Sequence, residues 1–247
     1  MKYVGRLMGK VVPCSVALLA ASLVSLHAQT QQGSATVFGL KGSADYSDGG
    51  GTWMPLKVGK VLRAGAIIRT APDSQVDLNL KRNGPVVRVT QNTTLGLDKL
   101  LFENTGADVV IETALDLKAG RILGRVNKTA AASKYEVKTP HSVTGIRGTE
   151  YDISADGLVI VKNGSAIVVF VDAQGKSNTF VVNERQTFDP TIPGVRGATG
   201  PEIDQVNPPP PGTPAPPFVV VYEPGREPYV SPISSDDIAN PPSSTSF

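Results

Sequence analysis

Short apolar stretches recur through the middle of the chain, from residue 33 to residue 189, and glycine-containing turns separate them. Val76, Leu78 and Leu80 alternate with Asp77 and Asn79, which predicts a strand with one buried and one solvent-facing side. The best candidate for a helix, residues 108–117, alternates similarly and suits a strand at least as well. Strands are predicted at residues 35–40, 66–70, 76–80, 86–90, 122–126, 135–137, 150–154, 158–162, 166–171 and 180–182.

The turns between these strands are marked by Asn-Gly, Asp-Gly and similar pairs, because these residues tolerate the positive φ of a tight hairpin. Such signals stand at residues 48–51, 83–84, 156–157, 163–164 and 174–175. From residue 150 to residue 182, strand and turn alternate at a regular spacing. The pattern predicts one all-β domain of short strands, arranged as a sandwich, a barrel or a solenoid.

Proline dominates the chain from residue 190 onward, where 15 of its 20 prolines lie. Proline has no backbone donor and a fixed φ, so residues 190–247 are predicted to be extended or disordered. The stretch from Phe218 to Tyr222 is the exception, because it is apolar, β-branched and free of proline. It can dock as a strand on the domain or on a partner, or remain a short apolar stretch in a disordered tail.

The first 28 residues have the features of an export signal. Three basic residues and no acidic one precede an uncharged apolar run at residues 11–26. This run of 16 residues is shorter than the ~20 that cross a bilayer. We therefore expect cleavage before Gln29 and no membrane insertion afterwards, with an uncleaved anchor as the alternative. The residues before Cys14 do not form a lipobox, which argues against a lipoprotein.

Removal of residues 1–28 changes the composition of the exported part. It takes away the only cysteine, and it leaves 21 basic against 22 acidic residues. A near-neutral chain without a basic block is not expected to bind nucleic acid, since phosphate neutralisation needs clustered lysine and arginine. Without disulfides the exported domain depends on its core, which fits a periplasmic or secreted bacterial protein better than a small disulfide-linked scaffold.

Residue types suited to catalysis or metal binding are sparse. His141 is the only histidine left after cleavage, and it follows Pro140 in a turn-like stretch, where we expect a surface loop residue. Cysteine–histidine metal sites are excluded by count, and Asp45 and Asp48 lack the further acids of a calcium loop. We predict no enzyme, no cofactor and no metal. A hydrolase that uses two carboxylates is the weakest alternative, since no motif marks such a pair.

A first cluster of distinctive residues opens the β-rich region. Trp53, the only tryptophan, is expected to anchor the core between tight glycine turns, with a ligand-stacking role as the alternative. The positions of this first cluster are Trp53, Pro55, Leu56, Gly59, Gly65, Arg69 and Thr70.

A second cluster lies at residues 137–153. Proline favours an extended residue before it, and two glycines allow the backbone to bend or to approach another strand. Arg147 carries five donors, so we predict that it binds backbone carbonyls or pairs with Glu150 or Asp152 and fixes the path of the chain. An anion-binding or partner-binding site is the alternative. The positions of this second cluster are Thr139, Pro140, Gly145, Arg147, Gly148 and Thr149.

Together the two clusters resemble the FecR-type domain, the periplasmic part of iron-dicitrate sensor regulators. The first part of the likeness is Trp-x-Pro-Leu-x-x-Gly-x-x-Leu-x-x-Gly at residues 53–65, followed by Ile-Arg-Thr at 68–70. The second part is Thr-Pro-x-x-Val-x-Gly-Ile-Arg-Gly-Thr-Glu-Tyr at residues 139–151. Residues 115–126 fit the strand–glycine–strand of the family between them, so that the likeness covers roughly residues 50–185.

The resemblance implies an all-β periplasmic domain of short strands in a twisted, solenoid-like arrangement. In the founding members it implies sensing, in which the domain contacts a partner at the outer membrane and relays iron–siderophore status to a sigma factor. Only 10 residues precede the apolar run, so we expect no cytoplasmic anti-sigma domain. The leading hypothesis is an exported, non-enzymatic module that binds a protein or a cell-envelope component. The alternative is a membrane-anchored sensor or regulator of signal transduction.

Overall fold

The computed structural model describes residues 29–49, 51–106, 108–192, 194–210, 218–221 and 229–232. The predicted export signal lies outside the described residues, as does most of the chain beyond residue 210, so the predictions for them stay predictions. Among the described residues, almost all regular structure is strand, with a short 3-10 helix η1 (Lys81–Asn83) and an α-helix α1 (Gly200–Gln205). The all-β prediction is confirmed.

The strands form two rows, and neighbours within each row are hydrogen-bonded. The first row has the order β5 (Val61–Leu62), β2 (Ala35–Lys41), β7 (Gln75–Asn79), β8 (Val86–Val89), β11 (Arg121–Arg125), β13 (Ser142–Ser154), β14 (Val159–Val171), β16 (Gln186–Phe188) and β17 (Val195–Gly197). The second row has the order β4 (Met54–Pro55), β3 (Ala44–Asp48), β6 (Ala66–Thr70), β9 (Thr94–Asn104), β10 (Val109–Ala119), β12 (Lys134–Lys138), β13, β14 and β15 (Ser177–Asn183). Strand β1 (Gln31–Gln32) adds to β9.

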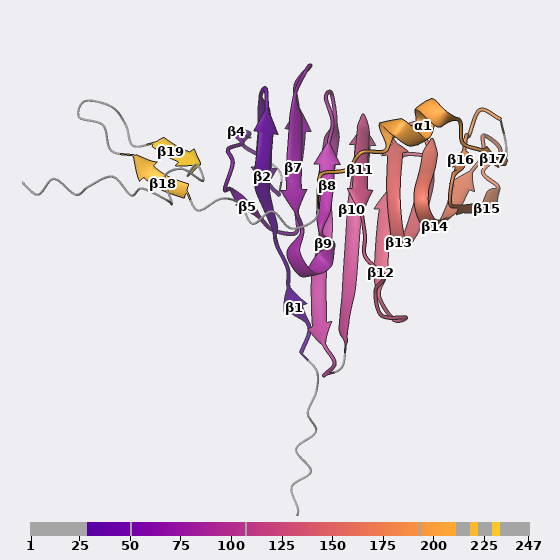
Figure 1. Cartoon of the computed structure of the whole chain (residues 1–247), viewed down its shortest axis with the longest axis horizontal. Coiled ribbons are helices and arrows are strands. Elements are labelled where there is room, and N and C mark those ends of the chain that lie inside the picture. Colours follow the sequence, from indigo (N-terminus) through magenta and orange to yellow (C-terminus); the bar gives the residue numbers. More distant parts are fainter. Residues whose placement is uncertain are drawn as a thin grey trace, which may run out of the picture.

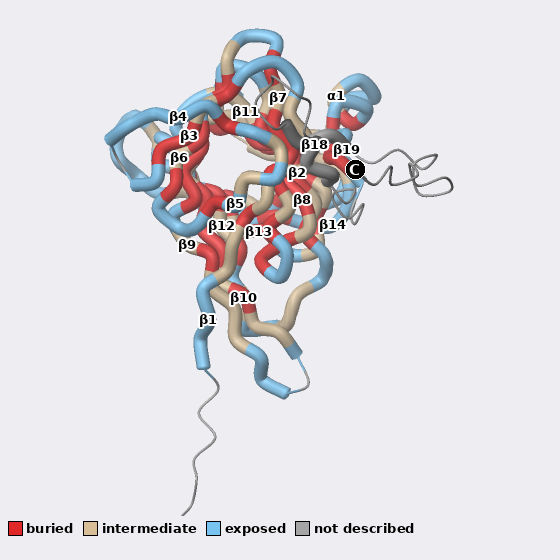
Figure 2. The backbone as a smooth tube through the Cα atoms, turned by 90° about the vertical axis from the view of Figure 1, so that its left-hand side faces the viewer, coloured by how far each residue is buried: buried red, intermediate tan, exposed pale blue. Residues whose placement is uncertain are grey.

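The chain passes repeatedly from one row to the other, so the rows advance together along the molecule. In Figure 1 the strands follow one another from β2 and β4 at one end to β15, β16 and β17 at the other. Seen along this axis in Figure 2, the sheet curls round on itself. This curled sheet of short strands agrees with the predicted twisted, solenoid-like or sandwich arrangement.

A continuous apolar core fills the space between the rows, and both rows contribute to it. Leu78 on β7, Leu97 on β9, Leu115 on β10, Tyr151 on β13 and Phe188 on β16 have no exposed surface. Each belongs to a different strand, because alternate side chains of every strand point to the same interior. Burial of this apolar surface is the main source of stability for the chain.

The side of β7 that was predicted to face solvent is covered by another part of the chain. Asp77, expected on the wet side of its strand, is buried and accepts hydrogen bonds from Arg88 at 2.7 and 2.9 Å. Arg88 in turn donates to the carbonyl oxygen of Asn207 at 3.2 Å. The prediction of a half-wet strand is therefore wrong at Asp77, because a distant part of the chain lies over this side.

That distant part is residues 195–210, which we call the C-terminal strap. It contains β17 and α1, and it crosses the first row near the top of the molecule in Figure 1. Ile203 and Val206 are buried against Ile160 of β14, and the nearby prolines 208 and 209 are also buried. The prediction that the chain is extended or disordered from residue 190 onward is wrong for the strap.

Local sequence explains why the strap contains a helix despite its prolines. The side chain of Thr199 accepts a hydrogen bond from the amide of Glu202, and Glu202 accepts one from the amide of Thr199, which makes a capping box. Pro201 lies in the first turn, where no amide donor is needed. Hydrogen bonds from Arg196 and Thr199 lower the pKa of Glu202 to about 2, so its carboxylate stays charged at neutral pH.

Beyond the strap the described chain contains one further pair of strands. Strands β18 (Phe218–Val221) and β19 (Tyr229–Pro232) pair antiparallel as a separate two-stranded sheet. The apolar exception predicted within the tail is therefore a strand.

Candidate protein-binding edge and face

Trp53 lies at the surface. Its side chain is 36% exposed, and the guanidinium of Arg69 stacks 4.1 Å from the centre of its ring. Arg69 also donates to the carboxylate of Asp45 at 2.9 and 3.0 Å. The prediction of a core tryptophan is therefore wrong. The buried anchor of this segment is Leu56, three residues later, because Trp53 belongs to the exposed loop before β4.

The rest of the first cluster shapes the turns at this end of the molecule. Gly59 and Gly65 have φ values of 86° and 91°, which side chains disfavour. Their amides donate to the carbonyls of Val37 and Leu97, each at 2.8 Å. Pro55 is exposed in the short strand β4.

Thr70 takes part in a buried network of threonines that joins successive turns of the chain. Its hydroxyl donates to the carbonyl of Thr90 at 2.5 Å and accepts from the amide of Thr93 at 2.9 Å. The hydroxyl of Thr93 then accepts from the amide of Arg121 at 3.0 Å. Three segments that are far apart in sequence are thus held side by side.

Arg147 is exposed, and within the described part of the chain its side chain has no hydrogen-bond or ion-pair partner. Glu150 instead pairs with Arg125 at 2.6 Å, and Asp152 pairs with Arg121. The prediction that Arg147 fixes the chain path is therefore wrong. Its side chain alternates with that of buried Ile146 and so points to solvent.

The start of the second cluster forms a tight turn. The hydroxyl of Thr139 accepts from the amides of Ser142 and His141 at 3.0 and 3.3 Å. Pro140 and His141 are exposed at this turn, so the prediction of a surface loop histidine is confirmed.

Gly148 and Thr149 mark the point where β13 and β14 pass from one row to the other. The register between these strands shifts there, so that residues 148 and 149 together oppose Gly164. Gly148 and Gly164 have φ values of 66° and 85°, and the hydroxyl of Thr149 donates to the carbonyl of Ser165 at 2.6 Å. A second shift restores the register, so the bulges bend both strands without disturbing the pairing on either side.

Beyond this bend, the last three strands of the second row carry an exposed apolar face. Ile167 is 52% and Val181 is 55% exposed, and the two are cross-strand partners. Val143 and Val169 are likewise exposed partners, and glycine at position 145 lies opposite Ile167. The face consists of Val143, Ile167, Val169, Val171 and Val181, which are five of the nine large apolar side chains exposed in the described residues.

β15, the last of these strands, forms an unprotected edge of the sheet. Natural sheets protect their edges with very short strands, prolines or charges. Strands β4 and β5 have two residues each, and β17 has three and carries Arg196, which holds α1 through Glu202 at 2.7 Å. Strand β15 has seven residues without a proline or a charge, and no described strand pairs with its outer edge.

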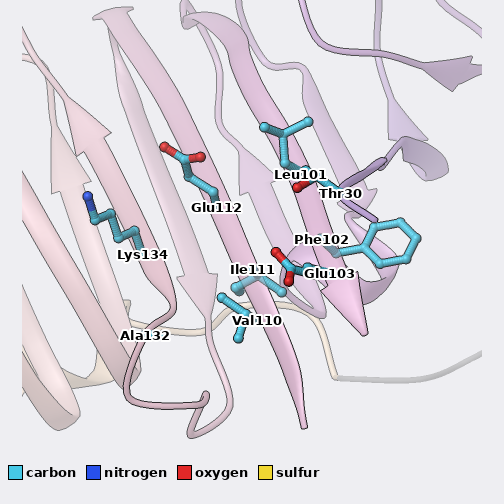
Figure 3. Close-up of a pocket in the computed structure, with 9 residues that line it drawn as sticks. All are labelled: Thr30, Leu101, Phe102, Glu103, Val110, Ile111, Glu112, Ala132 and Lys134. Atoms are coloured by element: carbon cyan, nitrogen blue, oxygen red, sulfur yellow. The ribbon is translucent and has the colours of Figure 1, made fainter. Parts of the chain in front are cut away.

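A shallow groove lies between β9, β10 and β12, around residues 101–103, 110–112 and 132–134. Figure 3 shows Leu101, Ile111, Glu112 and Lys134 among the side chains around it. Glu112 bonds to Lys99 at 2.6 Å, so its carboxylate is already paired. The groove therefore combines a small apolar floor with charges of both signs, and nothing in it marks a reaction.

Residues able to hold a metal ion do not come together in the part of the chain that the structure describes. Within the same ranges, no helix is long and apolar enough to cross a membrane.

Sequence reasoning missed the apolar face, although a signal for it was present. Residues 166–171 read Ala-Ile-Val-Val-Phe-Val. Because every position of this strand is apolar, both of its sides are apolar. Only one side of β14 packs on the core here, because Ala166 and Val168 are buried while their neighbours are exposed. The candidate functional site is therefore the edge of β15 together with the apolar face beside it.

The model of the FecR protein family matches residues 66–179. No curated protein and no solved structure matches the chain. The matched region runs from β6 into the first residues of β15, so it includes the bend at Gly148 and the part of the apolar face on β13 and β14, whereas Val181 lies just beyond it. The expected FecR-type domain is confirmed over residues 66–179, which contain the whole second cluster and, of the first cluster, Arg69 and Thr70.

Proposed function

We propose that this chain is an exported, non-enzymatic FecR-type module that binds a protein outside the cytoplasm. The observation that carries the proposal is the combination of an unprotected edge at β15 and the exposed apolar face around Ile167. Monomeric proteins rarely leave large contiguous apolar surface exposed, and such surface marks interaction sites.

The type of partner follows from the geometry of this site. An edge strand offers unpaired backbone donors and acceptors, and a partner that adds a strand satisfies them. The adjacent β-branched side chains supply apolar contact, which suits a protein segment better than a nucleic acid or an anion. The FecR family, through its sensing members, favours a role in signal transduction at the bacterial envelope, where the domain is typically periplasmic.

Replacement of Ile167 by lysine is expected to lower capture of this partner at least about tenfold, because a lysine in an apolar contact must be desolvated. Tagged wild-type protein and the Ile167→Lys variant would be compared in pull-downs from envelope extract of the native cells. Val61→Lys is the matched control, because Val61 is 47% exposed on β5 at the far end of the molecule. Equal capture by wild-type and Ile167→Lys protein would contradict the proposal.

A second candidate function is a membrane-anchored periplasmic sensor that retains residues 11–26. The FecR family match favours it, because the family comprises signal-transduction regulators. The two candidates differ in the mature N-terminus. We expect intact-mass and N-terminal analysis of the native protein to show a chain that starts at Gln29; retention of the first residues in the inner membrane would establish the anchored sensor instead.

A further inference from the structure

We propose that the free edge of β15 receives strand β18 from a second copy of this chain. The proposal rests on the proposed function, since it names the partner of the same edge and face. Each copy then has one donor, the β18–β19 hairpin, and one acceptor, β15.

The donor is incomplete by itself. Strands β18 and β19 have four residues each and pair only with each other among the described strands. A two-stranded hairpin is marginally stable in water, and a third strand or an apolar surface is needed to stabilise it. The sequence Phe-Val-Val-Val of β18 has the β-branched and aromatic composition that favours strand addition.

One edge of the hairpin is better suited to pairing than the other. Strand β19 ends in Pro232, and proline lacks the donor that an added strand requires. Strand β18 has neither proline nor charge. The same two properties characterise β15, so the open edges of both elements match in composition and in the absence of any charge that would oppose their approach.

The acceptor also offers apolar contact beside the edge. Val181 on β15 and its partner Ile167 on β14 are both more than half exposed. A strand added to β15 places alternate side chains on the same side as these two. Backbone hydrogen bonds and valine–valine contact would therefore act together, as they do in strand addition generally.

The path of the strap favours a second copy over the chain's own hairpin. The strap passes over the first row from β14 towards β8. Lys162 of β14 donates to the carbonyl of Val206 at 3.0 Å, and Arg88 of β8 donates to the carbonyl of Asn207 at 3.2 Å. In the first row β8 is five strands from the edge strand β17, so the chain travels away from β15. Figure 1 shows this course.

Only a short link remains between the strap and the hairpin. Eight residue steps separate Pro210 from Phe218, and they reach at most about 28 Å when fully extended. To reach β15, the chain's own hairpin would have to turn back across β11, β13 and β14 within that distance. The hairpin of a second copy meets no such limit.

Donor and acceptor are different surfaces, so the contact is heterologous. Two copies can exchange hairpins and close a pair, or successive copies can extend an open chain. Variants that break only one surface should then complement each other. Val181→Lys removes the acceptor, and the double variant Val219→Asp, Val220→Asp removes the donor, since adjacent strand residues point to opposite sides and one of the two must face the partner.

Sedimentation velocity of the purified full chains tests the proposal. We expect wild-type protein to sediment as two or more chains, each variant alone as a single chain, and an equal mixture of the two variants as a pair. The Val61→Lys protein should behave as wild type, and circular dichroism should show that every variant keeps its β structure.

Two results would overturn the inference. Wild-type protein that sediments as a single chain at every concentration has no such contact. Self-association that Val181→Lys abolishes but the tail variant preserves means that β15 pairs with β15. If either result occurs while Ile167→Lys still loses the captured envelope protein, the proposed function stands and only the identity of the partner fails.

Discussion

Arg121→Ala is expected to destabilise the protein by about 3 kcal/mol, at the lower end for removing one partner of a buried ion pair. Asp152 is 1% exposed on β13, and Arg121 donates to its carboxylate through Nε at 2.7 Å and through Nη2. Without Arg121 the carboxylate keeps its burial and loses both hydrogen bonds. About a third of Arg121 is exposed, so water can enter in its place and limit the loss.

The size of this loss should depend on pH. Burial raises the pKa of Asp152, and the hydrogen bonds and charge of Arg121 oppose that rise. In Arg121→Ala the folded-state pKa rises further above the value of about 4 in the unfolded chain. The folded protein then binds a proton that the unfolded chain has released, so stability falls as the pH rises through this window. The difference from wild type should be smaller at pH 4 than at pH 7.

Chemical denaturation at both pH values measures the effect. Arg69→Ala is the matched control, because the Arg69–Asp45 pair has the same chemistry with both side chains well exposed. Exposed pairs contribute between about 0 and 1 kcal/mol, and the exposed stacking of Arg69 on Trp53 adds about 0.5–1 kcal/mol, so the control should lose less than Arg121→Ala at pH 7 and should depend little on pH. A similar loss in the two variants would show that burial of Asp152 does not set the cost.

Gly164→Ala should cost about 3 kcal/mol. Gly164 has a φ of 85°, where an alanine is strained by about 1–2 kcal/mol. A methyl group there would also overlap the carbonyl oxygen of Gly148 across the bend. Because both strands are fixed by pairing on either side, the backbone must shift to make room, at a further cost of about 1–3 kcal/mol.

Gly175→Ala separates these two contributions. Gly175 has a φ of 79° in an exposed turn, and a methyl group there meets no atom within 4 Å. It should lose only the backbone term, about 1–2 kcal/mol. Thermal or urea unfolding of both variants gives the comparison, and equal losses would mean that the close approach of Gly148 and Gly164 does not constrain the bend.

Local features of the fold were predictable from sequence, because turns and strands depend on neighbouring residues. The glycine pairs at residues 156–157 and 174–175 do stand at turns between strands, whereas the pair at 163–164 lies at a bend inside β14, so the two strands predicted on either side of it are one strand. Trp53 and Arg147 were misplaced because burial depends on which surfaces pack together, and a residue type does not determine that. The strap was missed for the same reason: its prolines argued against a sheet, whereas its packing depends on Ile160 on a distant strand.

The candidate site was beyond sequence reasoning in a different way. The composition of β15 is ordinary for a strand, and whether a strand ends a sheet is decided by the order of all the others. The two apolar sides of residues 166–171 were visible. They are equally typical of a strand buried on both sides, so only the topology shows that one side is left open.

The strap has a consequence for the order in which the protein folds. Strands pair mainly with strands that are near them in sequence. Successive turns of the solenoid can therefore form while the chain is being synthesised, as in other solenoids. The contact of Arg88 with Asn207 spans 119 residues, and it forms only when nearly the whole domain has been made. Until then Asp77 and Arg88 face water, and a chain that stops before the strap would contain every strand from β1 to β16 but leave the first row uncovered.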